Sequence, residues 1–216
     1  MYKKFTFLLL LSSLLALNLK AQTAPSYFEG QVVYNNTYKS KDPKITDKRF
    51  AAMFGSTHNY FVDKNGNYRT ETNGMFAQWQ MYLSADNKIY NKMTYTDTVF
   101  WNSGLDYDDQ VLNVSVKKHA LKILGYDCDE LVLTCRSGVQ KYYYSSKLAI
   151  DPEKYKNHLF ANYYNYVSRA KALPLKMIIE DQGFIMESTV TSVTYKPLAK
   201  DFFKLAPGTK LLKSQY

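Results

Sequence analysis

Short runs of alternating apolar and polar residues, separated by turn residues, recur along most of the chain. Phe28, Val32 and Tyr34 fall at even spacing, which is typical of a strand with one buried face. Asn65-Gly66 between two such runs favours a tight hairpin. The pattern predicts about eleven short strands, and their close succession favours an antiparallel meander that curls on itself. Strands are expected at residues 27–38, 58–63, 67–73, 78–84, 88–95, 98–102, 128–136, 139–145, 175–180 and 184–195, with a short one before residues 206–208. Residues 111–118 and 120–124 are two weaker strand candidates.

Two segments have helical signals instead. Asp42-Pro43 offers a helix N-cap followed by proline at the first helical position, and Gly55 is a suitable end for that helix. Asp151-Pro152 repeats the signal and begins a second helical segment, with an interruption, to about Arg169. The predicted fold is therefore mainly β, a curved antiparallel sheet with two helical insertions covering its concave face.

The first residues have the pattern of a secretion signal. Lys3 and Lys4 precede an apolar run from Phe5 to Leu17, which is shorter than the roughly 20 residues that span a bilayer as a helix. We expect a signal peptide over residues 1–21, cleaved near Ala21, and a single domain over residues 22–216. An uncleaved membrane anchor is the alternative. No cysteine lies directly after the cleavage site, where a lipid could be attached, and no later apolar run is long enough to span a membrane. We therefore expect a location in the periplasm, with secretion to the outside as the second alternative.

Charge and cysteines narrow the function classes. The net charge of +9 falls to +6 when Lys3, Lys4 and Lys20 leave with the signal peptide, and the remaining charges are scattered. A scattered surface charge does not favour nucleic-acid binding. Cys128 and Cys135 lie on one expected strand, about 23 Å apart at 3.3 Å per residue, whereas a disulfide needs Cα atoms within about 7 Å. Two unpaired, buried cysteines on opposite faces of the strand are expected.

Catalytic and metal-binding motifs are missing from the sequence. His58, His119 and His158 are far apart, and none lies in an HExxH or CxxC pattern, so no metal site or cofactor is expected. No GxSxG elbow and no glycine-rich phosphate loop occurs. We therefore do not expect an enzyme, although residues that converge from distant strands leave that alternative open.

Aromatic residues are abundant on the expected strands. The chain has 20 tyrosines, 12 phenylalanines and two tryptophans, and three consecutive tyrosines, Tyr142 to Tyr144, must face alternate sides of the sheet. One interpretation is a core with an aromatic rim, because aromatic residues favour strands in any case. The other interpretation is a concave apolar cavity that binds an apolar ligand, with tyrosine hydroxyls at its solvent-exposed edge. The candidate lining residues are Trp79, Tyr90, Met93, Tyr142 and Met177.

Four short segments together resemble a known family. They are residues 123–128 (ILGYDC), 142–144 (YYY), 172–176 (ALPLK) and 202–208 (FFKLAPG). This pattern resembles the exported DUF4412 proteins of Bacteroidetes, which are similar in architecture to the lipoprotein carriers of the LolA/LolB type. The resemblance implies a half-barrel whose helices plug an apolar groove. No individual lipid-contacting residue of those carriers can be matched onto this chain.

The sequence thus supports a soluble periplasmic binding module that holds a lipid or other apolar ligand in a half-barrel groove, with a role in envelope lipid or lipoprotein handling. The alternative is a cell-envelope interaction protein that docks a partner protein through an exposed aromatic face. An enzyme is the third possibility, and it requires a polar cleft in which titratable groups are in contact.

Overall fold

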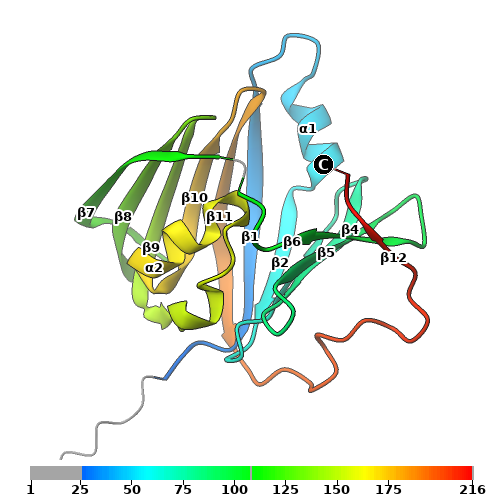
Figure 1. The fold of residues 1–216 in the computed structure, drawn as a ribbon. Coiled ribbons are helices and arrows are strands. Elements are labelled where there is room, and N and C mark those ends of the chain that lie inside the picture. Colours follow the sequence, from blue (N-terminus) through cyan, green and yellow to red (C-terminus); the bar gives the residue numbers. More distant parts are fainter. Residues whose placement is uncertain (1–25, 108, 216) are drawn as a thin grey trace, which may run out of the picture.

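A single twelve-stranded sheet forms the body of the protein (Figure 1). The computed structural model describes residues 26–107 and 109–215, so the expected signal peptide lies outside the described residues. Neighbouring strands run in the order β12-β6-β5-β4-β3-β2-β1-β11-β10-β9-β8-β7. The strands are β1 (Gly30–Ser40), β2 (Thr57–Val62), β3 (Tyr68–Thr72), β4 (Ala77–Leu83), β5 (Lys88–Met93), β6 (Val99–Ser103), β7 (Val111–Ile123), β8 (Tyr126–Cys135), β9 (Val139–Ala149), β10 (Ala172–Glu180), β11 (Phe184–Tyr195) and β12 (Leu211–Lys213).

The predicted fold class is confirmed. The sheet is open and curved, and all its pairings are antiparallel except that of β12, which joins β6 in parallel. The sheet consists of two series of antiparallel strands that are consecutive in the sequence, β1–β6 and β7–β11. The two series meet where β1 pairs with β11 along its whole length. None of the helices in the described residues has the length and apolar character needed to cross a membrane.

Three local predictions were wrong in detail. The helix α1 spans Asp47–Phe54 and is capped by Thr46, whose side chain accepts a hydrogen bond from the Arg49 amide, and not by Asp42. Asp42 instead closes a turn by accepting from the Lys44 amide. The two strands expected around residues 111–124 are one strand, β7, kinked where His119 has a φ of 51°. The short strand expected before residues 206–208 is an irregular segment, and β12 follows it.

The second helical insertion lies inside the curve of the sheet. It consists of two short 3-10 helices, η1 (Pro152–Tyr155) and η2 (Phe160–Asn162), and of α2 (Tyr163–Ala170). Asp151 caps η1 through its side chain, as the Asp-Pro signal predicted. Figure 1 shows α2 lying across β9, β10 and β11. The helix α1 lies on the same face near the far end of β1, where Phe50 and Phe184 rings are 5.1 Å apart. Both predicted insertions therefore cover parts of the concave face.

The segment from residue 196 to residue 210, here called the strap, covers the opposite, convex face of strands β2 to β6. Figure 1 shows the strap passing beneath this half of the sheet before it reaches β12. The Phe202 ring lies 4.8 Å from that of Phe61, and Phe203 and Leu205 pack against the buried cluster of Met81, Tyr90 and Val99. Strands β4 and β5 thus bury apolar side chains on both faces, Tyr82 and Ile89 on one and Met81 and Tyr90 on the other, which explains their weak alternation.

Both cysteines are buried and unpaired, so the prediction that they form no disulfide is confirmed. Burial raises the pKa of Cys128 and raises that of Cys135 to about 11. Thiols kept in this protonated state react slowly with oxidants, since the thiolate is the nucleophile. The pair therefore contributes to packing in the main core.

Gly55 shows how closely α1 packs against the hairpin of β3 and β4. Its φ is +95°, and a Cβ at this position would lie 1.9 Å from Thr72 Oγ1. We expect Gly55→Ala to lower the free energy of unfolding by about 2 kcal/mol or more, because left-handed backbone strain alone costs about 1–3 kcal/mol. Urea unfolding monitored by circular dichroism measures the change. The control is Gly183→Ala, where nothing lies within 4 Å, and an equal loss in both variants would contradict this account.

Candidate functional site

Stacked tyrosines fill the concave face beneath the second helical insertion. Tyr142 of β9 stacks on Tyr166 of α2 with ring centroids 4.2 Å apart, and Tyr68 of β3 lies 5.4 Å from Tyr163. Two of the buried hydroxyls bind backbone carbonyls: Tyr34 donates to that of Pro174 at 2.7 Å, and Tyr166 donates to that of Ala172 at 2.8 Å. Hydrogen-bonded, close-packed rings of this kind form a core. The predicted plug of the groove is therefore present, and the space beneath it is occupied.

His158 lies at the centre of this tyrosine layer. It is 1% exposed, and its Nε2 lies 2.8 Å from the Tyr68 hydroxyl. The imidazole is stacked between Tyr82 and Tyr163, whose ring centroids lie 4.2 and 4.5 Å away. Burial lowers its pKa to about 3, so the ring is neutral at physiological pH. Its Nδ1 has no hydrogen-bond partner among the residues that the structure describes. We interpret His158 as a structural residue.

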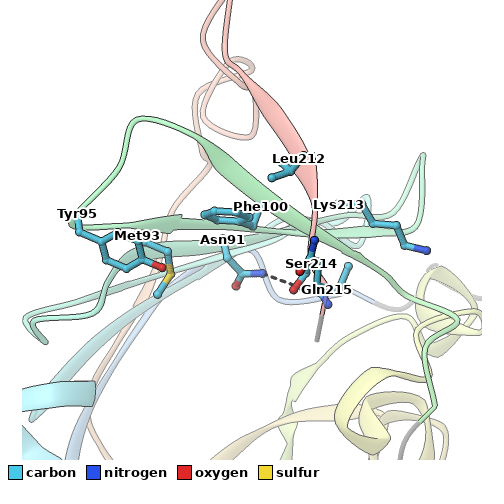
Figure 2. A pocket seen from close by; sticks show the side chains of 9 residues that line it. Asn91, Met93, Tyr95, Phe100, Leu212, Lys213, Ser214 and Gln215 are labelled. Atoms are coloured by element: carbon cyan, nitrogen blue, oxygen red, sulfur yellow. Dashed lines mark hydrogen bonds between the residues drawn. The ribbon is translucent and has the colours of Figure 1, made fainter.

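An open groove of about 480 Å³ lies on the same concave face, beyond the insertion. Strands β5, β6 and β12 form it, and Figure 2 shows Met93 and Tyr95 at one end and Ser214 and Gln215 at the other. The volume falls in the range of about 300–1,000 Å³ that is usual for small-molecule sites. Its lining residues are Asn91, Met93, Tyr95, Phe100, Asn102, Leu212, Lys213, Ser214 and Gln215.

Strand pairing explains why these side chains meet. Ile89 of β5 pairs with Tyr82 of β4, whose ring contacts His158, so this side of β5 is concave. Side chains two residues apart share a face, which places Asn91 and Met93 there as well. Phe100 of β6 pairs with Asn91 on one side and with Leu212 of β12 on the other. The groove is thus assembled by register across three neighbouring strands.

A row of amides forms the polar side of the groove. Gln80 Nε2 donates to Asn91 Oδ1 at 2.9 Å, and Asn91 Nδ2 donates to Asn102 Oδ1 at 3.4 Å. An amide carries two donor hydrogens and two acceptor lone pairs, so one donor and one acceptor of Asn91 remain for a ligand. Met93, Phe100 and Leu212 supply apolar surface alongside. The groove can therefore hold a molecule that is apolar over most of its length and hydrogen-bonds at one place.

The structure separates the five predicted lining residues into three places. Trp79 and Tyr90 belong to the cluster on the convex face, because Tyr90 pairs with Met81 and not with the concave row. Tyr142 and Met177 are directly paired between β9 and β10 and pack into the main core, Met177 half-buried. Met93 alone lies in the open groove.

Sequence reasoning missed the other groove residues for identifiable reasons. Asn91 and Phe100 stand on strands that the sequence predicted, and the available signal was a polar residue between Ile89 and Met93 on one face of β5. The contribution of Leu212 had no local signal, because β12 is three residues long and pairs in parallel with a strand far away in the sequence.

Another hollow, of about 530 Å³, lies between the strap and the β2–β3 turn. Charged side chains dominate its lining: Glu29, Asp63, Lys64, Lys200 and Lys204. Asp63 is engaged by the turn itself, since it accepts hydrogen bonds from the amides of Asn65 and Asn67. Among the described residues no three His, Cys, Asp or Glu side chains gather where they could hold a metal ion.

Comparisons with known proteins give only distant likenesses. The sequence matches no protein-family model and no curated protein sequence. Two structures of PNGF-II, in different space groups, align with TM-scores of 0.45 and 0.42 at 13% and 12% identity over 87% and 85% of this chain. The chain spans about a third of PNGF-II, 32% and 31% of its length. LprF from Mycobacterium bovis aligns with a TM-score of 0.30 at 12% identity, over 78% of this chain and 89% of LprF.

Likenesses this distant say nothing about what the groove binds. The resemblance to the DUF4412 proteins stays a prediction, while the curved sheet with helices on its concave face, which that resemblance implied, is the fold observed.

Proposed function

We propose that the protein is an exported binding module that holds a lipid, or another amphipathic molecule with an apolar chain, in the groove of β5, β6 and β12. The observation that carries the proposal is the juxtaposition of Met93, Phe100 and Leu212 with a row of amides on the open part of the concave face. An apolar strip beside a few fixed hydrogen-bonding groups is the usual composition of a small-molecule site.

The exposure of the groove's apolar residues supports a ligand. Leu212 is 51% exposed and Tyr95 is 71% exposed, although both stand beside half-buried apolar neighbours. Covering such surface stabilises a complex by roughly 25 cal/mol per Å² of apolar area. An acyl chain lying along β6 would cover Phe100 and Leu212 together and leave its polar end near Asn91.

The proposed role is one of binding in the periplasm and not of catalysis. The signal-like N-terminus supports export, and the composition of the groove supports binding. The described residues that line it include Ser214 but no His, Asp or Glu that could activate this hydroxyl as a nucleophile. Involvement in the handling of envelope lipids or lipoproteins is the corresponding cellular proposal.

A charge placed in the groove tests the proposal. We expect the mature protein to bind cis-parinaric acid, a fluorescent fatty acid, and Leu212→Glu to weaken that binding at least tenfold, because a carboxylate beside the acyl chain must be desolvated. Fluorescence titration gives the dissociation constants, and native mass spectrometry after incubation with phospholipid extract identifies retained lipid.

The matched control is Leu112→Glu. Leu112 is 61% exposed on β7, at the opposite edge of the sheet from β12. It makes the same chemical change away from the groove and should leave binding intact. Equal binding by Leu212→Glu and the native protein, or no binding by the native protein, would refute the proposed function.

A further inference from the structure

Backbone hydrogen bonds join three segments that are distant in sequence, beyond the end of the groove. The amides of Met75 and Phe76 donate to the carbonyls of Ala52 and Met53 in α1, at 2.9 and 3.2 Å. The amide of Thr94, after β5, donates to the Phe76 carbonyl at 2.9 Å. The end of α1, the β3–β4 turn and the β5–β6 turn thus form one unit at the right of Figure 1.

This unit carries four exposed large apolar side chains, here called the apolar tip. Single exposed apolar residues are common on protein surfaces, but a contiguous group marks an interaction site. The rings of Phe54 and Phe76 contact each other edge to face, 6.1 Å apart. Met75 precedes Phe76 in the turn, and Tyr95 follows Thr94, whose amide and side chain bind the carbonyls of Phe76 and Met75. The residues and their exposed fractions are Phe54 38%, Met75 64%, Phe76 41% and Tyr95 71%.

The backbone holds the apolar tip in place. At Gly74 a Cβ would lie 2.6 Å from the Phe54 carbonyl carbon, so α1 and the turn are in direct backbone contact. Thr94 is bonded to the turn through its side chain as well, to the Met75 carbonyl. Little conformational freedom is therefore left to lose when the tip binds, which favours binding.

Basic side chains stand next to the apolar tip. Lys48 and Arg49 are exposed on α1, and each lies one helical turn before the residue whose carbonyl binds Met75 or Phe76. Neither forms an ion pair within the part of the chain that the structure describes. Two carboxylates lie in the same unit, but Asp97 pairs with Lys92 and Asp47 accepts a hydrogen bond from the Ser40 amide. An apolar surface beside unpaired cations is complementary to the interface of an anionic bilayer, where acyl chains begin just below negative headgroups.

The tip is also continuous with the groove. Tyr95 belongs to the apolar tip and lines the groove, and Met93 follows it inward (Figure 2). We propose that the apolar tip docks the protein on an anionic lipid bilayer, with the mouth of the groove at the membrane surface. The role of the groove in this arrangement rests on the proposed function, whereas the docking itself does not.

Flotation with lipid vesicles tests the docking. We expect the mature protein to float with vesicles of phosphatidylethanolamine and phosphatidylglycerol, and to float less at high salt or with pure phosphatidylcholine vesicles. Met75→Ser/Phe76→Ser should lower the partition coefficient at least tenfold. The matched control is Leu112→Ser/Val116→Ser, which removes two side chains 61% and 51% exposed from β7 and should float like the native protein. Circular dichroism melting verifies that both variants fold.

The readouts separate this inference from the proposed function. Binding of cis-parinaric acid from solution should survive in Met75→Ser/Phe76→Ser, and flotation should survive in Leu212→Glu. A native protein that binds the fatty acid but does not float, or a tip variant that floats normally, would overturn the docking alone. A concentration-dependent dimer that disappears in the tip variant, without flotation of the native protein, would assign the tip to a second copy of the chain and also overturn it.

Discussion

Raising the pH above about 10 should unfold the protein cooperatively, within about one to two pH units. The reason is the buried tyrosine layer. Burial raises the pKa of each of its members above the ordinary value of 10.0, and well above it for Tyr68, Tyr155 and Tyr166. These side chains remain protonated in the folded state at pH values where the unfolded chain has already released their protons.

The sign and the size of the effect follow from proton linkage. Above pH 10 the unfolded state binds fewer protons than the folded state, so the free energy of unfolding falls as the pH rises. Each tyrosine contributes about 1.4 kcal/mol per pH unit until its folded-state pKa is reached. Five tyrosines that are at most 8% exposed give about 7 kcal/mol per pH unit, against a typical total stability of about 5–15 kcal/mol. They are Tyr34, Tyr68, Tyr142, Tyr155 and Tyr166.

Absorbance at 295 nm and circular dichroism, recorded together against pH, check this expectation. The ionisation of the buried tyrosines should coincide with the loss of β structure. In Tyr166→Phe the loss of stability between pH 10 and 11 should be smaller by about 1 kcal/mol, because the unfolded-state tyrosine is only half ionised at pH 10. Tyr95→Phe, at a tyrosine 71% exposed, should leave it unchanged. Ionisation of all tyrosines near pH 10 with circular dichroism unchanged would contradict the account.

Local chemistry was sufficient to predict most of the sheet. The turn at Asn65-Gly66 does join β2 to β3, with Val62 opposite Tyr68 and Gly66 at a φ of +86°. The alternation of apolar and polar residues identified the long strands, because one of their faces is buried and the other is exposed to solvent. The sequence could not distinguish Asp42 from Thr46 as the cap of α1, since both are good N-caps and only the tertiary position of the helix decides between them.

The groove was less predictable because it depends on non-local pairing. Trp79 and Tyr90 are apolar and on strands, as expected of lining residues, but the strap covers their face of the sheet. No sequence pattern near β4 or β5 indicates that Phe203 and Leu205 pack against the convex face of these strands. The alternation of a strand shows which residues share a face, and long-range packing alone decides which face is covered.

The division of the concave face links the fold to the proposed function. Between β7 and β1, α2 and its tyrosines occupy the curve of the sheet, and Tyr166 is bound to the backbone of β10. Beyond η1, no helix of the described residues lines the groove on β5 and β6, and the short strand β12 extends the sheet there by one strand. The plug thus stabilises one half of the sheet while the other half keeps a surface for a ligand.

Lowering the pH from 6.5 to 5 should cost about 2 kcal/mol of stability through His158 alone. Its folded-state pKa of about 3 lies below the ordinary 6.5. Below pH 6.5 the unfolded chain therefore binds a proton at this residue and the folded chain does not. The free energy of unfolding falls as the pH is lowered, down to about pH 3. Most carboxylates are still ionised at pH 5, so histidines dominate this window. Burial also lowers the pKa of His58, so the contribution of His158 is the difference in pH dependence between the native protein and a variant that lacks this imidazole.

A paired substitution separates the titration of His158 from its packing. His158→Phe alone leaves the buried Tyr68 hydroxyl without its partner, at a cost of about 1–3 kcal/mol, whereas Tyr68→Phe/His158→Phe removes both hydrogen-bonding groups and keeps the stacked rings. Urea unfolding at pH 6.5 and 5 should show the loss of about 2 kcal/mol in the native protein and a much smaller one in the double variant. His119→Gln, at a side chain 77% exposed and in contact with Asp127, measures separately what a histidine outside the core contributes. A double variant with the native pH dependence would show that His158 is not the group that titrates, and would place the acid sensitivity elsewhere in the chain.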